Sequence, residues 1–254
     1  MLEWLSKKVL KEGKMYSYNS RIRYSEVNEK FKLSLISLVD YFQDCAAFES
    51  EDKNVGFKWM MTKGTMWMLM DWHIKIFRRP MYSEKVTISS KTIKVEGYKA
   101  FRNFEMKTEA GETLAAALSI WAFIDMKAGV PTADIPQEEL DAYGMEAPLD
   151  IEFDVSPIEQ PKDATKGEPI TIVPSNLDSN HHVNNAEYVT LALSVLPDEV
   201  KKVKGFPKEF RVEYRKQTFL GEELTTEYTV TENKAIVVLR GSKGEAKCVT
   251  EFIY

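Results

Sequence analysis

The stretch NLDSNHHVNNAEYV, residues 176–189, holds side chains that could carry out hydrolytic chemistry. Asp178, Asn180 and His182 supply a carboxylate, an amide and an imidazole at alternate positions. In an extended segment, alternate side chains project from the same side of the backbone. Such a set could activate a water molecule and stabilise a tetrahedral intermediate. The spacing therefore makes these three residues candidate catalytic residues.

The same stretch also predicts the start of a helix. Asn184 has the residue type of an N-cap, and Glu187 follows three positions later. His182 would then lie just outside the positive end of the helix, where unpaired N–H groups can hold an anion. Asparagine and aspartate are favoured in caps for structural reasons alone, so a helix cap with a surface histidine remains an alternative.

The chain contains an internal repeat. The segment from Ile172 superposes on the segment from Ile22 with an offset of 150, and FLGEELT (219–225) matches MYSEKVT (81–87) with an offset of 138. Structural need alone would shape both copies alike, so a chemical difference between them indicates a functional site in the second copy. The polar residues that differ are Asp178, Asn180, His182, Asn184 and Asn185, opposite Asn28, Lys30, Lys32, Ser34 and Leu35.

Each copy predicts one long helix beside an antiparallel sheet, which is an α+β fold. In the first copy Ser34 caps a helix with apolar residues at the helical period, namely Leu35, Leu38, Val39, Phe42 and Ala46. Residues 66–77 alternate as a strand, with one face formed by Met66, Met68, Met70, Trp72, Ile74 and Ile76. Paired strands flank residues 95–98 and 109–113, and the second copy repeats this pattern after residue 172.

Six of the ten prolines lie between residues 127 and 171, where regular periodicity disappears. This composition predicts a connecting segment on the surface. The expected organisation is an N-terminal extension (1–14), a first unit (15–126), a linker (127–171) and a second unit (172–254). Residues 1–14 lack a signal-peptide core, and we expect a leader helix or a disordered extension there.

The composition is that of a soluble globular protein without a bilayer-spanning run, and we expect a cytoplasmic location. The net charge of −5 argues against general nucleic-acid binding. Cys45 and Cys248 have neither metal-ligand nor redox-pair spacing, and three histidines leave little material for a zinc site. We therefore expect no metal and no disulfide framework.

Residues 176–189 resemble the signature of acyl-ACP thioesterases, an Asp-x-Asn-x-His-Val-Asn-Asn string followed shortly by tyrosine. Three more segments resemble the family in the same order, at residues 33–46, 119–136 and 212–224. The resemblance implies a tandem hotdog fold, in which two antiparallel sheets each wrap around a long helix. It also implies hydrolysis of fatty acyl-ACP thioesters without a cofactor, with the family's Asp, Asn and His at Asp178, Asn180 and His182.

The chain departs from plant members of the family at one point. They place Glu and Cys after a Glu-Tyr-Arg-basic string, where this sequence has Gln217 and Thr218. Gln217 cannot act as a base, although its amide could orient water or a partner side chain. The resulting hypothesis is hydrolysis by activated water. Asp178 would be the base or a transient nucleophile, His182 would orient groups or shuttle a proton, and Asn180 would position the thioester or the water.

By the same resemblance, the first unit holds the acyl chain. The methionine-rich segment 59–72 suits an adaptable apolar tunnel, although an ordinary core role is the alternative for each residue. The predicted chain contacts are Met66, Met68, Met70 and Trp72. Further substrate contacts are predicted at Asn184, Asn185 and Arg215.

The expected macromolecular partner is acyl carrier protein, which is acidic and presents the acyl chain on phosphopantetheine. Arg211, Arg215 and Lys216 could dock it by charge. Two alternatives remain open: an acyl-CoA thioesterase, and a non-catalytic acyl-binding protein if the replaced Glu–Cys pair is decisive. Neither nucleic-acid binding nor membrane insertion is expected, and the chain could be a monomer or a homodimer.

Overall fold

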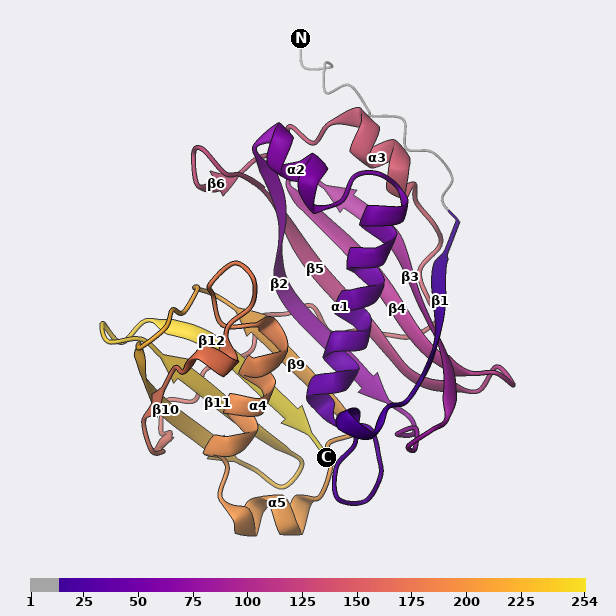
Figure 1. The fold of residues 1–254 in the computed structure, drawn as a ribbon. Helices are drawn as coiled ribbons and strands as arrows, with labels where there is room; N and C mark the ends of the chain where they lie inside the picture. The colour runs from indigo at the N-terminus through magenta and orange to yellow at the C-terminus, as the bar shows by residue number, and fades with distance from the viewer. Residues whose placement is uncertain (1–13) are drawn as a thin grey trace.

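The computed structural model describes residues 14–254, so the expected leader helix falls almost entirely outside the described residues. The described chain forms a twelve-stranded antiparallel sheet with one long helix on each half (Figure 1). The antiparallel pairing of β2 with β9 joins the two halves edge to edge. The expected α+β architecture, with an antiparallel sheet around a long helix in each half, is therefore confirmed.

The first half holds α1 (Leu35–Asp52) and five strands, in the sheet order β1 (Tyr16–Arg21), β3 (Lys85–Glu96), β4 (Lys99–Thr108), β5 (Thr113–Asp125) and β2 (Thr65–Ile76). The second half holds α4 (Asn185–Val195) and continues with β9 (Glu209–Tyr214), β12 (Ala246–Ile253), β11 (Lys234–Arg240), β10 (Glu223–Val230) and β7 (Thr165–Lys166). Two short strands pair at the sides, β6 (Val130–Pro131) with β5 and β8 (Ile170–Thr171) with β10. The shorter helices are α2 (Phe57–Lys63), α3 (Gln137–Tyr143), α5 (Asp198–Lys204) and the 3₁₀ turns η1 (Tyr24–Glu26) and η2 (Pro174–Asn176).

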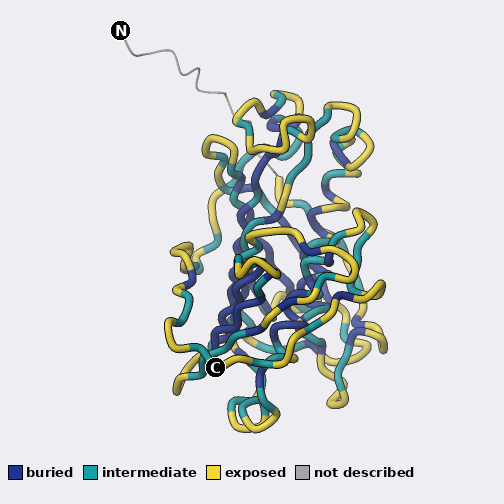
Figure 2. The backbone as a smooth tube through the Cα atoms, turned by 90° about the vertical axis from the view of Figure 1, so that its left-hand side faces the viewer, coloured by how far each residue is buried: buried dark blue, intermediate teal, exposed yellow. Residues whose placement is uncertain are grey.

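Helix α1 begins where the sequence predicts. The Ser34 side chain accepts a hydrogen bond from the Ser37 N–H at 3.2 Å, which satisfies one free donor of the first turn. Its apolar face packs on the sheet, where the Phe42 ring lies 6.0 Å from Trp72 and 5.5 Å from Phe104. One hydrophobic core runs through both halves and includes residues of α1 and α4 (Figure 2). Each half therefore depends on the other for part of its buried surface.

Strand β2 contains a bulge that the sequence pattern does not reveal. Leu69 pairs with Trp121 and Asp71 pairs with Ile120, so Met70 is an extra residue on this strand. Leu69 and Trp72 are consequently both buried in the core, whereas Met68 is 39% exposed. The prediction that residues 66, 68, 70 and 72 share one face is wrong, because the bulge exchanges the two faces of the strand.

The proline-rich connecting segment lies across the joint between the halves. The Arg211 guanidinium pairs with the Asp154 carboxylate at 2.9 Å, and the Ile158 N–H donates to Glu213. The N–H of Asp154 donates to Nδ1 of His73 at 2.9 Å, and the other ring nitrogen of His73 contacts Glu209. This segment also contains helix α3, which packs over one end of the first half (Figure 1).

Candidate active site

The turn that carries the candidate catalytic residues is closed by one of them. Oδ1 of Asp178 accepts the N–H groups of Asn180 at 2.8 Å and His182 at 3.3 Å. The Asp178 N–H donates to the His182 carbonyl at 2.8 Å, and His181 has a φ of 62°. The predicted extended geometry is therefore wrong. The segment is a tight turn held by an aspartate side chain, a common use of this residue, and only Oδ2 of Asp178 is left for chemistry.

Helix α4 begins directly after this turn. Asn184 is the N-cap, and its side chain accepts the Ala186 N–H at 2.9 Å. Glu187 does not complete a capping box, because its carboxylate accepts a hydrogen bond from the Asn176 amide instead. The Asn184 side chain is therefore engaged as a cap, while Asn185 borders the cavity described below.

The segment 215–219 lies alongside the turn. The Val183 N–H donates to the Thr218 carbonyl at 3.0 Å, and the His182 ring meets the Phe219 ring edge to face at 5.0 Å. The Gln217 carbonyl accepts a hydrogen bond from Lys247 at 2.9 Å, and its side chain is exposed. These contacts bring position 217 next to His182, although 35 residues separate them in the sequence.

The turn opens onto a cavity of about 150 Å³ between the two halves of the sheet. The second half supplies Asp178, Asn180, His182, Val183, Asn185, Tyr188, Tyr214, Arg215, Lys216 and Gln217. The first half supplies Met66, Trp67, Met68, Leu69 and Trp121. The structure thus gathers most of the predicted site residues around one space. Asn184, Met70 and Trp72 do not border it.

Tyr188 and Tyr214 form part of the cavity wall. Neither was predicted as a site residue, although both lie in the segments that resemble the family. The Tyr214 hydroxyl donates to the Asn185 carbonyl at 2.8 Å, and the two tyrosine rings meet edge to face at 5.7 Å. Burial raises the pKa of both phenols above its ordinary value, so they remain neutral hydrogen-bond donors. Burial also raises the pKa of Cys45 and of Cys248 to about 12, as expected for core thiols rather than nucleophiles.

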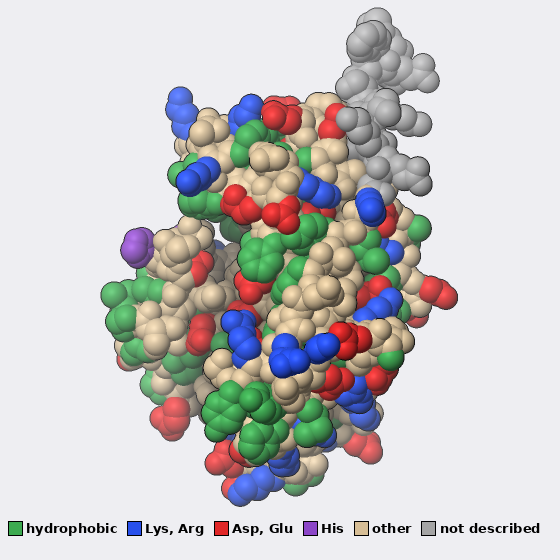
Figure 3. All heavy atoms as spheres, turned by 45° about the vertical axis from the view of Figure 1, so that its right-hand side comes forward, with side chains coloured by type: hydrophobic (Ala, Val, Ile, Leu, Met, Phe, Trp, Pro, Cys, Tyr) green, Lys and Arg blue, Asp and Glu red, His purple; other side chains and the backbone are tan. Residues whose placement is uncertain are grey.

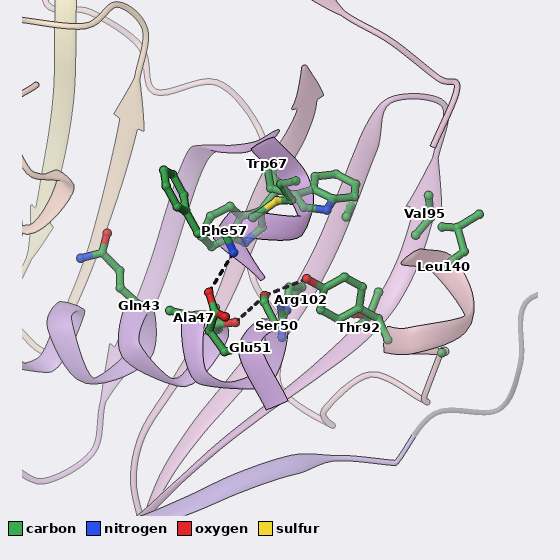
Figure 4. Close-up of a pocket in the computed structure, with 16 residues that line it drawn as sticks. Gln43, Ala47, Ser50, Glu51, Phe57, Trp67, Thr92, Val95, Arg102 and Leu140 are labelled. Carbon is green, nitrogen blue, oxygen red and sulfur yellow. Dashed lines mark hydrogen bonds between the residues drawn. The ribbon is translucent and has the colours of Figure 1, made fainter. Parts of the chain in front are cut away.

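A second, mostly apolar pocket of about 230 Å³ lies under the end of α1 in the first half (Figure 4). Trp67 and Trp121 border both this pocket and the first cavity, so the two spaces meet at these indoles. The other walls come from α1, α2, α3, β3 and β4. Trp72 lies in the core instead, against Phe42 and Phe104. Trp67, which was not predicted, borders both spaces, whereas the predicted Met70 and Trp72 border neither.

Among residues 14–254 there is no cluster of three or more His, Cys, Asp or Glu side chains with the geometry of a metal site. No helix in the same part of the chain is long and apolar enough to cross a membrane.

The chain matches two family profiles. The profile described as "Acyl-ACP thioesterase N-terminal domain" matches residues 13–143, and that described as "Acyl-ACP thioesterase C-terminal domain" matches residues 159–252. Among curated proteins, the chloroplastic palmitoyl-acyl carrier protein thioesterase of Gossypium hirsutum is 25% identical over 260 residues. That alignment covers 95% of this chain and 60% of the cotton protein. The chain thus spans a little over half the length of such relatives.

Solved structures show the same fold. An acyl-ACP thioesterase from Bacteroides thetaiotaomicron superposes with a TM-score of 0.81 at 23% identity, covering 94% of this chain and 97% of that one. The 12:0-ACP thioesterase from Umbellularia californica gives a TM-score of 0.79 at 18% identity, covering 94% and 96%. At these identities the likeness is one of fold, and it spans both halves of the sheet together.

Proposed function

Because the chain belongs to the acyl-ACP thioesterase family, we propose that it hydrolyses the thioester between a fatty acyl chain and acyl carrier protein. The products would be a free fatty acid and the carrier protein with its thiol. The observation that carries the proposal is the junction of two spaces at Trp67 and Trp121. A polar cavity with a carboxylate, an amide and an imidazole meets an apolar pocket, which is the arrangement that a thioester with a long chain requires.

The proposed base is Oδ2 of Asp178. Oδ1 is occupied by two backbone N–H groups, so the carboxylate is held in one orientation with its second oxygen available. In this mechanism Oδ2 takes a proton from water while the water oxygen attacks the thioester carbonyl carbon. The resulting oxyanion would be stabilised by the N-terminal end of α4, which begins at the cavity wall. Collapse of the tetrahedral intermediate breaks the C–S bond, and the departing thiolate takes up a proton.

His182 and Asn180 have supporting roles in the proposal. The His182 imidazole can carry the proton to the thiolate, and the Asn180 amide can position the carbonyl or the water. Gln217 borders the same cavity and can orient the water, but its amide has no basic group. Direct nucleophilic attack by Asp178 remains the alternative route, with an anhydride that water would then hydrolyse.

The acyl chain is proposed to pass between Trp67 and Trp121 into the apolar pocket. Met66 and Met68 lie on the cavity side of this passage and can adapt to the start of the chain. The phosphopantetheine arm would enter past Arg215 and Lys216, two exposed cations at the cavity edge. An acidic carrier protein would be attracted there.

We also propose the division into an extension (1–14), two units (15–126 and 172–254) and a linker (127–171). Two observations support these limits. The backbone hydrogen bonds of the first unit recur from Ile172 onward, and β5 ends at Asp125.

The proposal is tested by measuring fatty acid release from one acyl chain presented on acyl carrier protein and on coenzyme A. We expect a higher kcat/KM with the carrier protein, and a loss of roughly 100-fold in His182→Ala, the scale of one acid–base contribution. A preference for coenzyme A would instead identify an acyl-CoA thioesterase. Stoichiometric binding of acyl-ACP without turnover would identify an acyl-binding protein.

A further inference from the structure

Helix α3 of the connecting segment forms a wall of the apolar pocket. Leu140, Tyr143 and Gly144 border the pocket, and Figure 4 shows Leu140 beside Val95 at one end of it. The Tyr143 hydroxyl bonds Ser50 of α1 at 2.7 Å. The segment that joins the two halves therefore also helps to define the space where a chain would lie.

A buried carboxyl on α3 contacts one of the indoles shared by the two spaces. Glu139 is 0% exposed, and one of its oxygens accepts a hydrogen bond from Nε1 of Trp67. Its other oxygen, Oε2, is buried without a hydrogen-bond partner among the residues that the structure describes. The surroundings are apolar, since Trp67 packs with Phe123 and Leu140. A half-satisfied buried carboxyl destabilises the fold relative to an apolar side chain of similar size.

Trp67 borders both spaces. It precedes the bulge of β2, on the part of the strand beyond the pairing with β9, which spans Asp71–Lys75. Its ring packs on Phe123 at 4.9 Å, and its N–H points to Glu139. These two contacts fix the indole at the boundary between the polar cavity and the apolar pocket.

We propose that Glu139 is a positioning residue that holds the Trp67 indole at the side of this passage and so determines which acyl lengths are accepted. The proposal rests on the proposed function of the site. Without the hydrogen bond, the indole can rotate into the passage. Long chains must pass Trp67 to reach the apolar pocket, whereas a short chain stays in the polar cavity. Loss of the bond therefore penalises long substrates and spares short ones.

The test compares butanoyl-ACP with hexadecanoyl-ACP in wild type, Glu139→Leu, Glu139→Gln and Trp67→Phe. Glu139→Leu removes the hydrogen bond and frees the indole, so we expect the ratio of long-chain to short-chain kcat/KM to fall roughly tenfold. Trp67→Phe removes the indole that would close the passage, so we expect its ratio not to fall. Glu139→Gln keeps an oxygen acceptor for the indole, and we expect its ratio to stay within about twofold of wild type. Glu138→Gln is the matched control, because this neighbouring carboxylate is 64% exposed and pairs with Lys63 on the surface.

A purely structural role predicts a different pattern. If Glu139→Leu lowers kcat/KM equally for both substrates, or leaves the ratio unchanged, the proposal is overturned. The same holds if Glu139→Gln behaves like Glu139→Leu.

A binding measurement separates this proposal from the proposed function. Displacement of a fluorescent fatty acid by butanoic and hexadecanoic acid reports on the passage without any turnover. If wild type fails to hydrolyse either acyl-ACP but Glu139→Leu selectively loses hexadecanoic acid, hydrolysis is wrong and the role of Glu139 stands. If hydrolysis is normal and both acids bind equally to all variants, the role of Glu139 is wrong.

Discussion

The two copies of the turn before the long helices have the same backbone and different surroundings. In the first copy Asn28 accepts the N–H groups of Lys30 and Lys32 through its side chain, as Asp178 does for Asn180 and His182 in the second. The chain reversal has a φ of 55° at Phe31 and 62° at His181. Each turn pairs with a later segment, through the bridges Lys32–Met81 and His182–Phe219. Equivalent hydrogen bonds in the two copies are thus related by the same offsets of 150 and 138 residues as the sequence repeat.

The difference lies in what fills the space beside each turn. In the first copy Arg79 donates to the carbonyls of Leu33 and Lys32 and stacks on the Phe206 ring at 3.7 Å, which leaves a void of about 10 Å³. The same position in the second copy is Gln217, and the cavity there is about 150 Å³. The exposed aromatic rings of Tyr24, Phe31 and Tyr82 contact one another on the surface beside the first turn. Figure 3 shows a group of hydrophobic side chains on the surface at the lower end of the molecule.

Some of the polar residues in the second turn have a structural role that the first turn shares. A side-chain oxygen at position 28 or 178 is needed in both copies to close the turn, so polarity there is structural. What distinguishes the second copy is the second carboxylate oxygen of Asp178, the imidazole of His182 and the absence of a filling arginine. The two turns therefore share one backbone frame, and the second copy borders a much larger cavity than the first.

The largest effect is expected from removing that second oxygen. Asp178→Asn keeps Oδ1 for the turn, so the melting temperature should stay close to that of wild type while kcat falls roughly 100-fold or more. The matched change Asn28→Asp places a carboxylate in the first copy and should leave kcat unchanged. Steady-state kinetics and thermal unfolding of both variants check this. An active Asp178→Asn variant would remove Asp178 from the role of base.

The next test fills the cavity beside the second turn with an arginine side chain. Gln217→Arg should let the new guanidinium reach the carbonyls of His182 and Val183, as Arg79 reaches those of Lys32 and Leu33. We expect kcat/KM for acyl-ACP to fall roughly tenfold as the cavity closes, on the scale of a lost substrate contact. Leu220→Arg is the control for added charge, because Leu220 is exposed nearby and does not border the cavity. Equal losses in both variants would point to electrostatics rather than filling.

Removing the arginine that fills the space beside the first turn should affect stability and not activity. Arg79→Gln removes two hydrogen bonds to carbonyls and the stacking on Phe206, and we expect a loss of about 1–2 kcal/mol of unfolding free energy. Lys85→Gln is the control, because the ion pair of Lys85 with Glu109 joins two side chains that are each more than half exposed and contributes little. Urea unfolding measures both. A change in kcat for Arg79→Gln would show that the first copy takes part in catalysis.

Sequence reasoning recovered the features that depend on short-range pattern. The repeat, the Ser34 and Asn184 caps and the two helices follow from local chemistry, and the structure contains each of them. The bulge at Met70 could not be read from the strand alone, since it is decided by which residues of β5 pair with Leu69 and Asp71. Two further contacts could not be predicted from the sequence either: the packing of Arg79 beside the first turn and the hydrogen bond between Glu139 and Trp67. Both join segments that only the tertiary fold brings together.

The smallest effect is expected at the contact between the two long helices. Asp40 of α1 stands where the repeat places Thr190 in α4, so only the first copy carries a carboxylate there. Burial, followed by the nearby charges of Asp44, Glu187 and Glu26, raises the pKa of Asp40 from 3.8 to about 6. The folded state therefore holds this proton more tightly than the unfolded chain does. The stabilisation linked to it is complete below about pH 4 and is lost as the pH rises through about 6.

Asp40→Asn removes this dependence. We expect the variant to match wild type near pH 4 and to exceed it above pH 7, by at most about 1 kcal/mol, because Asp40 is only partly buried and water screens its charge. Denaturant unfolding at pH 4 and pH 8 checks this, with Glu199→Gln on the exposed side of α5 as the control. A gain of the same size at both pH values would mean that the substitution acts through packing. A gain confined to high pH would mean that the charge on α1 costs stability that the threonine of α4 does not.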